Sequence, residues 1–144
     1  MACQISYKDR EVLANNMQFS SLVDFAIEVA NLTARDESEQ LFADRMARMQ
    51  ENEFWPGRGI QIEEDFPDID EQKFWSRVFL DVARAIFDRR IGNHEHSFWQ
   101  AQRISQAYGT GQIFLYAVRQ TDRNWSPDFT DYREFGFVVN NRRP

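Results

Sequence analysis

The chain has 144 residues, of which 42% are hydrophobic and 15% aromatic, a composition that suits one globular domain and excludes a disordered chain. Its formal net charge of −6 disfavours general affinity for nucleic acid, because phosphates repel an acidic surface. No apolar run approaches the roughly 20 residues of a membrane-spanning helix, so we expect a protein without a membrane span.

The first fifty residues predict a short strand followed by helices. Residues 4–7 favour a strand and residues 9–16 a helical turn. A helix with one buried side is predicted over residues 20–32, because its apolar residues recur at three- and four-residue spacing. Another helix is predicted over residues 36–52, where Asp36 and a glutamate three residues later have the spacing of a capping box.

Residues 70–91 form the longest predicted helix and the expected centre of the fold. Unrolled at about 100° per residue, they place a wide apolar arc, which includes Phe74 and Trp75, on one side. The opposite side carries a charged stripe, interpreted as solvated, that consists of Lys73, Arg77, Asp81, Arg84 and Asp88. Before this helix, residues 54–69 are expected to form a long loop, because Trp-Pro-Gly-Arg-Gly is a turn by its chemistry.

The C-terminal third predicts further short elements. A helix is expected over residues 93–108, and the two glycines within residues 109–111 are expected to interrupt it. The apolar run 113–118 suits a buried helix or a buried strand, and a helix is favoured because the preceding chain is helical. Residues 130–139 suit a last short helix, with a strand over residues 135–139 as the alternative.

Together these elements predict a mainly α fold, an orthogonal or irregular bundle of five or six helices around the helix at residues 70–91. The alternative is an α+β fold with a small sheet formed by residues 4–7, 113–118 and 135–139. A single domain over residues 1–144 is expected in either case, because no linker, repeat or low-complexity tract divides the chain.

The strongest candidate for a functional surface is the acidic stretch at residues 60–71. Six carboxylates lie within nine residues there, with no basic residue between them, and a cationic partner would relieve their mutual repulsion. The predicted partner-binding residues are Glu63, Glu64, Asp65, Phe66, Asp68, Asp70 and Glu71, with the phenylalanine as an apolar anchor. A solvated loop that starts the next helix is the competing interpretation. A calcium or magnesium site is a weaker one, because the spacing lacks the central glycine of an EF-hand.

His94 and His96 are the candidates for acid–base chemistry or metal binding. Residues two apart in a regular helix diverge by about 200°, so these two side chains cannot hold one metal ion from such a helix. The competing interpretation is that they merely decorate the start of a helix. No metal site and no cofactor is predicted, and the two histidines remain a lower-ranked catalytic alternative.

Charge is divided unevenly along the sequence. Residues 1–72 hold 16 acidic and 6 basic residues, a net −10, whereas residues 73–144 hold 7 acidic and 11 basic residues, a net +4. Unless the halves interleave in space, we expect a protein that docks or neutralises a basic protein partner, as an inhibitor or immunity protein does. A small histidine-dependent enzyme and a homo-oligomeric assembly component are the alternatives. A single cysteine and an N-terminus without the apolar stretch of a secretory signal favour the cytoplasm.

Overall fold

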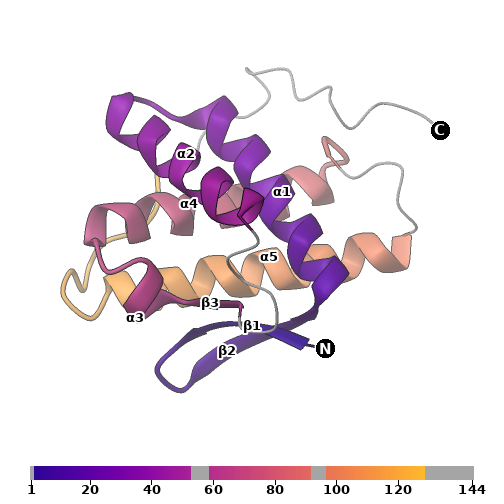
Figure 1. Cartoon of the computed structure of the whole chain (residues 1–144), viewed down its shortest axis with the longest axis horizontal. Helices are drawn as coiled ribbons and strands as arrows, with labels where there is room; N and C mark the ends of the chain where they lie inside the picture. The colour runs from indigo at the N-terminus through magenta and orange to yellow at the C-terminus, as the bar shows by residue number, and fades with distance from the viewer. Residues whose placement is uncertain (1, 53–58, 92–96, 129–144) are drawn as a thin grey trace.

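The computed structural model describes residues 2–52, 59–91 and 97–128, which form a three-stranded sheet and five helices (Figure 1). In chain order the elements are β1 (Ala2–Tyr7), β2 (Arg10–Asn15), α1 (Asn16–Thr33), α2 (Glu37–Glu51), β3 (Gly59–Gln61), α3 (Ile62–Asp65), α4 (Ile69–Phe87) and α5 (Ser97–Val118). The predicted helical majority is confirmed in this described part. A small sheet is also present, as the α+β alternative requires, although most of its members differ from those predicted.

The sheet begins with a hairpin whose strands are joined by a two-residue turn. β1 pairs with β2 in antiparallel register, with Tyr7 opposite Arg10. The turn residue Lys8 has a positive φ of 55°, as tight hairpin turns need at their first central position. β3 pairs in parallel with the other side of β1, so β2 and β3 form the two edges of the described sheet.

The predicted helical turn at residues 9–16 is wrong, because this segment contains strand β2. Val12 and Ala14 lie on the inner face of the sheet and pack with the core, whereas Leu13 between them is 55% exposed. That alternation has the two-residue period of a strand. Two adjacent apolar residues therefore belong to opposite faces, and only the strand geometry reveals this.

The first two long helices start at side-chain caps. Asn15 accepts a hydrogen bond from the main-chain N–H of Gln18 at 2.8 Å, and the Gln18 side chain accepts one from the N–H of Asn15 at 3.0 Å. This capping box starts α1 several residues before the predicted helix at 20–32. Asp36 caps α2 by accepting from the N–H of Glu39 at 2.9 Å, at the predicted position.

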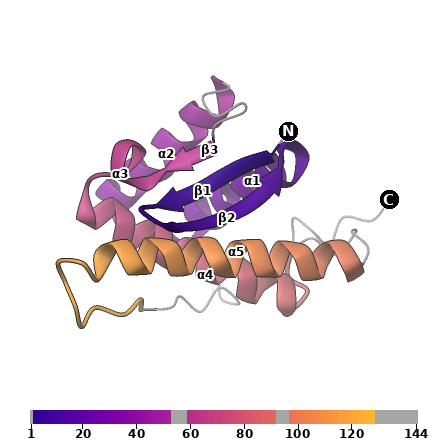
Figure 2. The ribbon, with the colours of Figure 1, turned by 90° about the horizontal axis from the view of Figure 1, so that it is seen from below.

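α4 is buried along most of its length and carries the aromatic core. The ring centroids of Trp75 and Phe79 lie 6.0 Å apart, and Phe79 stacks on Phe114 of α5 at 5.8 Å. Figure 2 shows α5 running beside the hairpin, with α1 and α2 on the far side of the sheet. The core thus lies among the inner face of the sheet, α1, α4 and α5.

The predicted interruption at residues 109–111 is wrong, because α5 continues through it, and residues 113–118 are helix rather than strand. A Cβ atom on Gly111 would stand 2.6 Å from Cγ of Leu80, so glycine permits α4 and α5 to approach closely. The Ser76 hydroxyl donates to the carbonyl of Gly111 at 3.1 Å across the same contact. The glycine therefore serves helix packing instead of ending the helix.

The predicted loop at residues 54–69 contains regular structure, because its second half forms β3 and α3. The short helix predicted at residues 130–139 lies outside the described residues. The same holds for residues 135–139, which were the third strand of the alternative sheet. None of the described helices combines the length and hydrophobicity that crossing a bilayer requires.

Replacing Gly111 with alanine is expected to lower the free energy of unfolding by about 1–2 kcal/mol. Overpacking against Leu80 costs roughly 1–3 kcal/mol, and the better helix propensity of alanine offsets up to about 1 kcal/mol of it. Urea unfolding followed by circular dichroism measures the change. Gly109→Ala is the matched control, because its methyl group meets only Cγ2 of the Val12 side chain. A Gly111→Ala protein as stable as the wild type would contradict the close helix contact.

Candidate functional site

The acidic stretch folds into α3 and the first turn of α4 instead of forming a loop. Glu63 and Glu64 are exposed on α3. Asp68 is the N-cap of α4, where its carboxylate accepts from the main-chain N–H of Asp70 at 2.8 Å. Asp70 itself lies in the first turn, where the positive end of the helix dipole stabilises a carboxylate. These four residues keep the exposure that a binding surface needs.

Two of the other predicted contact residues are part of the interior. The Phe66 side chain is fully buried, and its ring centroid lies 6.4 Å from that of Trp75 and 5.6 Å from that of Phe114. Asp65 is 8% exposed and accepts from the main-chain N–H of Gln61 at 2.8 Å. Phe66 is therefore a core residue and not the surface anchor expected from the sequence, because β3 and α3 fold it onto α4 and α5.

Glu71 is also buried, with 3% exposure, and it is matched by an arginine of the same molecule. Its carboxylate lies 3.3 Å from the Arg45 guanidinium and accepts from the indole N–H of Trp75 at 3.2 Å. Arg45 also donates to the carbonyl of Asp65 and lies over the Phe66 ring. Burial raises the pKa of Glu71 above its usual value, although Arg45 and the indole oppose the rise. This carboxylate is not available to a partner.

The exposed start of α4 lines a groove of about 580 Å³ between α2, α4 and residues 125–128. Among the acidic residues that line it are Asp36 from the start of α2 and Asp68 and Asp70 from the start of α4, and we call these three the acidic rim. The apolar lining consists of Leu41, Phe42, Phe74 and Trp125. Within the described residues, no ion pair joins the acidic rim to a cation.

Each cation that lines the groove lies beside a carboxylate outside the acidic rim. The ion pairs are Arg35–Asp128 at 3.6 Å, Lys73–Asp122 at 3.0 Å and Arg77–Glu39 at 3.1 Å. The Lys73 ammonium also lies 5.8 Å from the centroid of the Trp125 ring. The cations of the groove are thus balanced locally, and the negative charge of the acidic rim remains.

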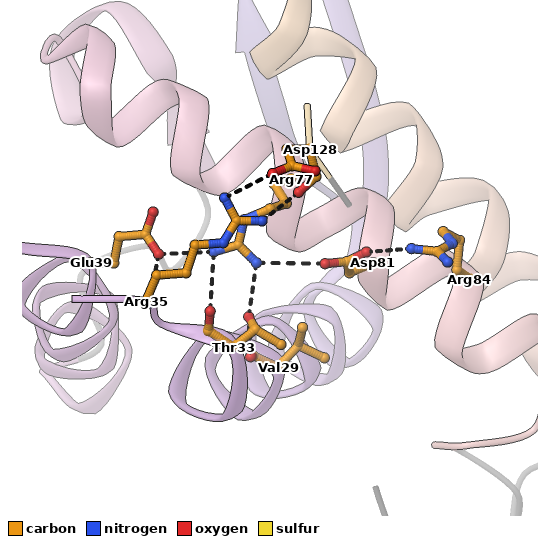
Figure 3. Close-up of polar contacts among 8 residues, drawn as sticks. All are labelled: Val29, Thr33, Arg35, Glu39, Arg77, Asp81, Arg84 and Asp128. Atoms are coloured by element: carbon orange, nitrogen blue, oxygen red, sulfur yellow. Dashed lines mark hydrogen bonds and ion pairs between the residues drawn. The ribbon is translucent and has the colours of Figure 1, made fainter. Parts of the chain in front are cut away.

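Arg77 is buried where α1, α2 and α4 meet (Figure 3). Beyond its ion pair with Glu39, its guanidinium donates to the Thr33 hydroxyl at 3.1 Å and lies 3.6 Å from the Asp81 carboxylate. Asp81 in turn accepts from Arg84 at 2.9 Å. Burial lowers the pKa of Arg77, and the carboxylates of Glu39 and Asp81 counteract this effect. The network fixes α2 against α4 and therefore shapes the groove.

The interpretation of the charged stripe of α4 as a solvated face is wrong at its centre. Arg77 is 3% exposed and Asp81 is completely buried. Helical spacing correctly groups these residues on one side of α4, but the end of α1 and the start of α2 cover that side. Lys73 and Arg84 on either side of this centre keep partial exposure, with 28% and 44% of the side chain accessible, and Asp88 at the end of the stripe is exposed.

His94 and His96 lie outside the described residues, so the catalytic alternative stays a prediction. Over residues 2–52, 59–91 and 97–128, no group of three or more histidine, cysteine, aspartate or glutamate side chains is arranged to hold a metal ion. The Cys3 thiol is buried and lies 3.0 Å from the side-chain oxygen of Asn16.

Sequence reasoning missed two parts of the groove, namely Asp36 and the aromatic lining. The capping-box spacing identifies Asp36 as the start of a helix, and this signal was correct. It does not show that the start of α2 lies beside the start of α4, because that proximity arises from contacts between distant residues, among them the ion pairs Arg77–Glu39 and Arg45–Glu71. Comparison of the chain with protein families, curated proteins and solved structures finds no match to any of them.

Truncating Arg77 to alanine is expected to lower the free energy of unfolding by about 3–5 kcal/mol, because the buried Asp81 loses one of its cations and Glu39 loses its partner. Arg84→Ala is the matched control, since it removes a half-exposed cation from the same Asp81, leaves the Arg77 network in place and should therefore cost less than Arg77→Ala. Urea unfolding of both variants measures the difference. Equal losses would contradict the assignment of Arg77 as the buried junction.

Glu71→Gln tests the effect of burial on the Glu71 carboxyl. A carboxyl whose pKa is raised in the folded state contributes stability that is complete below its unfolded pKa and is lost as pH rises through the folded pKa. The unfolding free energy of the wild type relative to Glu71→Gln should therefore fall as pH rises from about 4 towards neutrality. Urea unfolding at a series of pH values measures this slope. Glu51→Gln, at the exposed end of α2, controls for the substitution, and the opposite slope would show that the ion pair with Arg45 outweighs burial.

Proposed function

We propose that this protein binds a basic protein partner through the acidic rim and its groove. The observation that carries the proposal is that Asp36, Asp68 and Asp70 line one groove, and none of them forms an ion pair within the described residues. Three like charges around one groove repel one another. A cationic side chain placed among them relieves this repulsion. Its electrostatic interaction with the three carboxylates is more favourable than with an isolated one.

Arginine is the side chain of the partner that best suits the groove. Its planar guanidinium can donate to two carboxylate oxygens at once, and its aliphatic stem packs on apolar surface. Leu41 supplies such surface, because 58% of it is exposed, and Phe42 lies beside it in the groove lining. Glu63 and Glu64 are exposed on α3, shortly before Asp68 in the sequence, and the Glu63 carboxylate accepts from the main-chain N–H of Lys8 at 3.3 Å.

Neutralising a nucleic-acid-binding protein is the role that this chemistry suits best. Such proteins carry basic surfaces that hold phosphates, and carboxylates on a rigid scaffold imitate the charge of phosphates. The capping hydrogen bonds hold the Asp36 and Asp68 carboxylates in place before a partner arrives. Because the two side chains are already held in place, less conformational entropy is lost on binding. A cytoplasmic setting fits the role, since the single cysteine has no second cysteine in the chain to pair with.

The triple substitution Asp36→Asn, Asp68→Asn and Asp70→Asn tests the acidic rim. Asparagine caps helices as well as aspartate does, so the fold is kept while three charges are removed. The probe is the fluorescent peptide acetyl-Leu-Arg-Gly-Arg-Leu-Arg-amide, whose binding is followed by anisotropy. We expect binding to the triple variant to be about tenfold weaker, and binding to the wild type to weaken as salt increases.

The matched control is Asp9→Asn, Asp24→Asn and Glu51→Gln, which changes the net charge equally at exposed positions that do not line the groove. This control should keep nearly the wild-type affinity, apart from a small long-range effect. If both triple variants weaken binding equally, net charge and not the acidic rim attracts the peptide. If the wild type does not bind the peptide at all, the proposed function is wrong.

A further inference from the structure

β2 is an edge strand of the described sheet, because it pairs with β1 alone. The two-residue turn places Arg10 opposite Tyr7, so Arg10 and Val12 direct their main-chain groups towards β1. The intervening residue Glu11 directs its N–H and C=O away from the sheet. A strand edge of this kind is a template on which another extended segment can form hydrogen bonds.

A second groove, of about 430 Å³, lies along this edge and has the C-terminal half of α5 as its other wall. Figure 2 shows β2 beside α5. Val12 contributes to the groove from the strand, and Ile113 and Leu115 contribute from the helix. A groove between an open strand edge and a helix has the shape that holds an extended peptide, with main-chain hydrogen bonds on one side and side-chain contacts on the other.

Two arginines give this groove a positive character in a chain whose net charge is −6. The Arg10 guanidinium lies 4.0 Å from the centroid of the Tyr116 ring. Arg119 donates to the carbonyl of Trp125 at 2.9 Å and to the Ser126 hydroxyl at 3.0 Å. Within the described residues, neither guanidinium forms an ion pair with a carboxylate, so both charges remain to be matched.

The remaining charged residue of the groove is Glu11, and its carboxylate already accepts a hydrogen bond from the Gln4 side chain. Gln4 and Glu11 lie on the solvent-facing side of the hairpin, opposite to the core-facing Ile5 and Val12. Glu11 therefore lies on the other face of the hairpin from Arg10, and its single negative charge leaves the groove a net positive charge for its occupant.

We propose that the groove between β2 and α5 binds an extended acidic segment of a partner protein, which adds to the sheet beside β2. The main chain of the segment pairs with Glu11, and an aspartate or glutamate side chain of the segment lies between Arg10 and Arg119. The charge of the groove selects acidic over basic segments, and the strand edge selects extended over helical ones. This site is distinct from the acidic rim. A negative result for the peptide at this groove would therefore leave the function proposed above unaffected.

Binding of acetyl-Val-Glu-Val-Glu-Val-amide to the ¹⁵N-labelled full chain tests the proposal. We expect the amide resonances of Glu11, Leu13 and Tyr116 to shift, and those of the acidic rim to stay in place. The same peptide with an N-methylated central valine cannot form the strand pairing, and acetyl-Val-Lys-Val-Lys-Val-amide has the wrong charge. Each should bind at least tenfold more weakly.

Arg10→Gln is the informative variant, since the Arg10 side chain forms no hydrogen bond with another side chain in the described part of the chain, and it should weaken binding of the acidic peptide at least fivefold. Arg48→Gln, on the exposed side of α2, is the matched control and should have no effect. Sodium glutarate distinguishes a small-anion site from a peptide site. Equal binding of glutarate, of the N-methylated peptide or of the lysine peptide would overturn the proposal, as would the absence of binding by the acidic peptide.

Discussion

The placement of one buried guanidinium determines the arrangement of three helices. Arg77 donates from α4 to Thr33 at the end of α1 and forms an ion pair with Glu39 on α2. Its guanidinium also lies 3.6 Å from the Asp81 carboxylate. Removing an arginine from water is costly, and only a full set of acceptors offsets the cost. Together with the ion pair between Arg45 and Glu71, this network holds the start of α2 beside α4. The groove and the spacing of the acidic rim follow from that position.

The sequence was sufficient to predict features that depend on local spacing. The apolar periodicity of α4 and the capping aspartate of α2 are both confirmed, because each depends on residues three or four apart. What covers a helix face depends on elements far away in the chain. Arg77 and Asp81 have the spacing of a solvated stripe, and the sequence contains no local sign that α1 and α2 lie over them. The same limit explains why buried Phe66 was predicted to be a surface residue.

Two errors arose where tertiary packing overrides local preference. Val12 and Leu13 are compatible with a helical turn, and pairing with β1 selects the strand. Gly111 lowers helix propensity by about 1 kcal/mol, yet α5 continues through it because the close approach of Leu80 requires a residue without a side chain. Here a residue that usually ends helices is evidence of a tight helix pair. A sequence pattern alone does not distinguish the two meanings.

The acidic rim also shows why a formal charge count overstates the field that a partner meets. Asp36 and Asp68 are N-caps, and Asp70 follows in the first turn of α4, so the positive ends of two helix dipoles lie beside all three carboxylates. This explains how the fold tolerates the three carboxylates although no cation of residues 2–52, 59–91 or 97–128 forms an ion pair with them. It also limits their reach, because each capping oxygen is already directed at a main-chain N–H. A partner must then place its cations against the remaining oxygens at hydrogen-bond distance, and specificity would come from short-range geometry more than from long-range attraction.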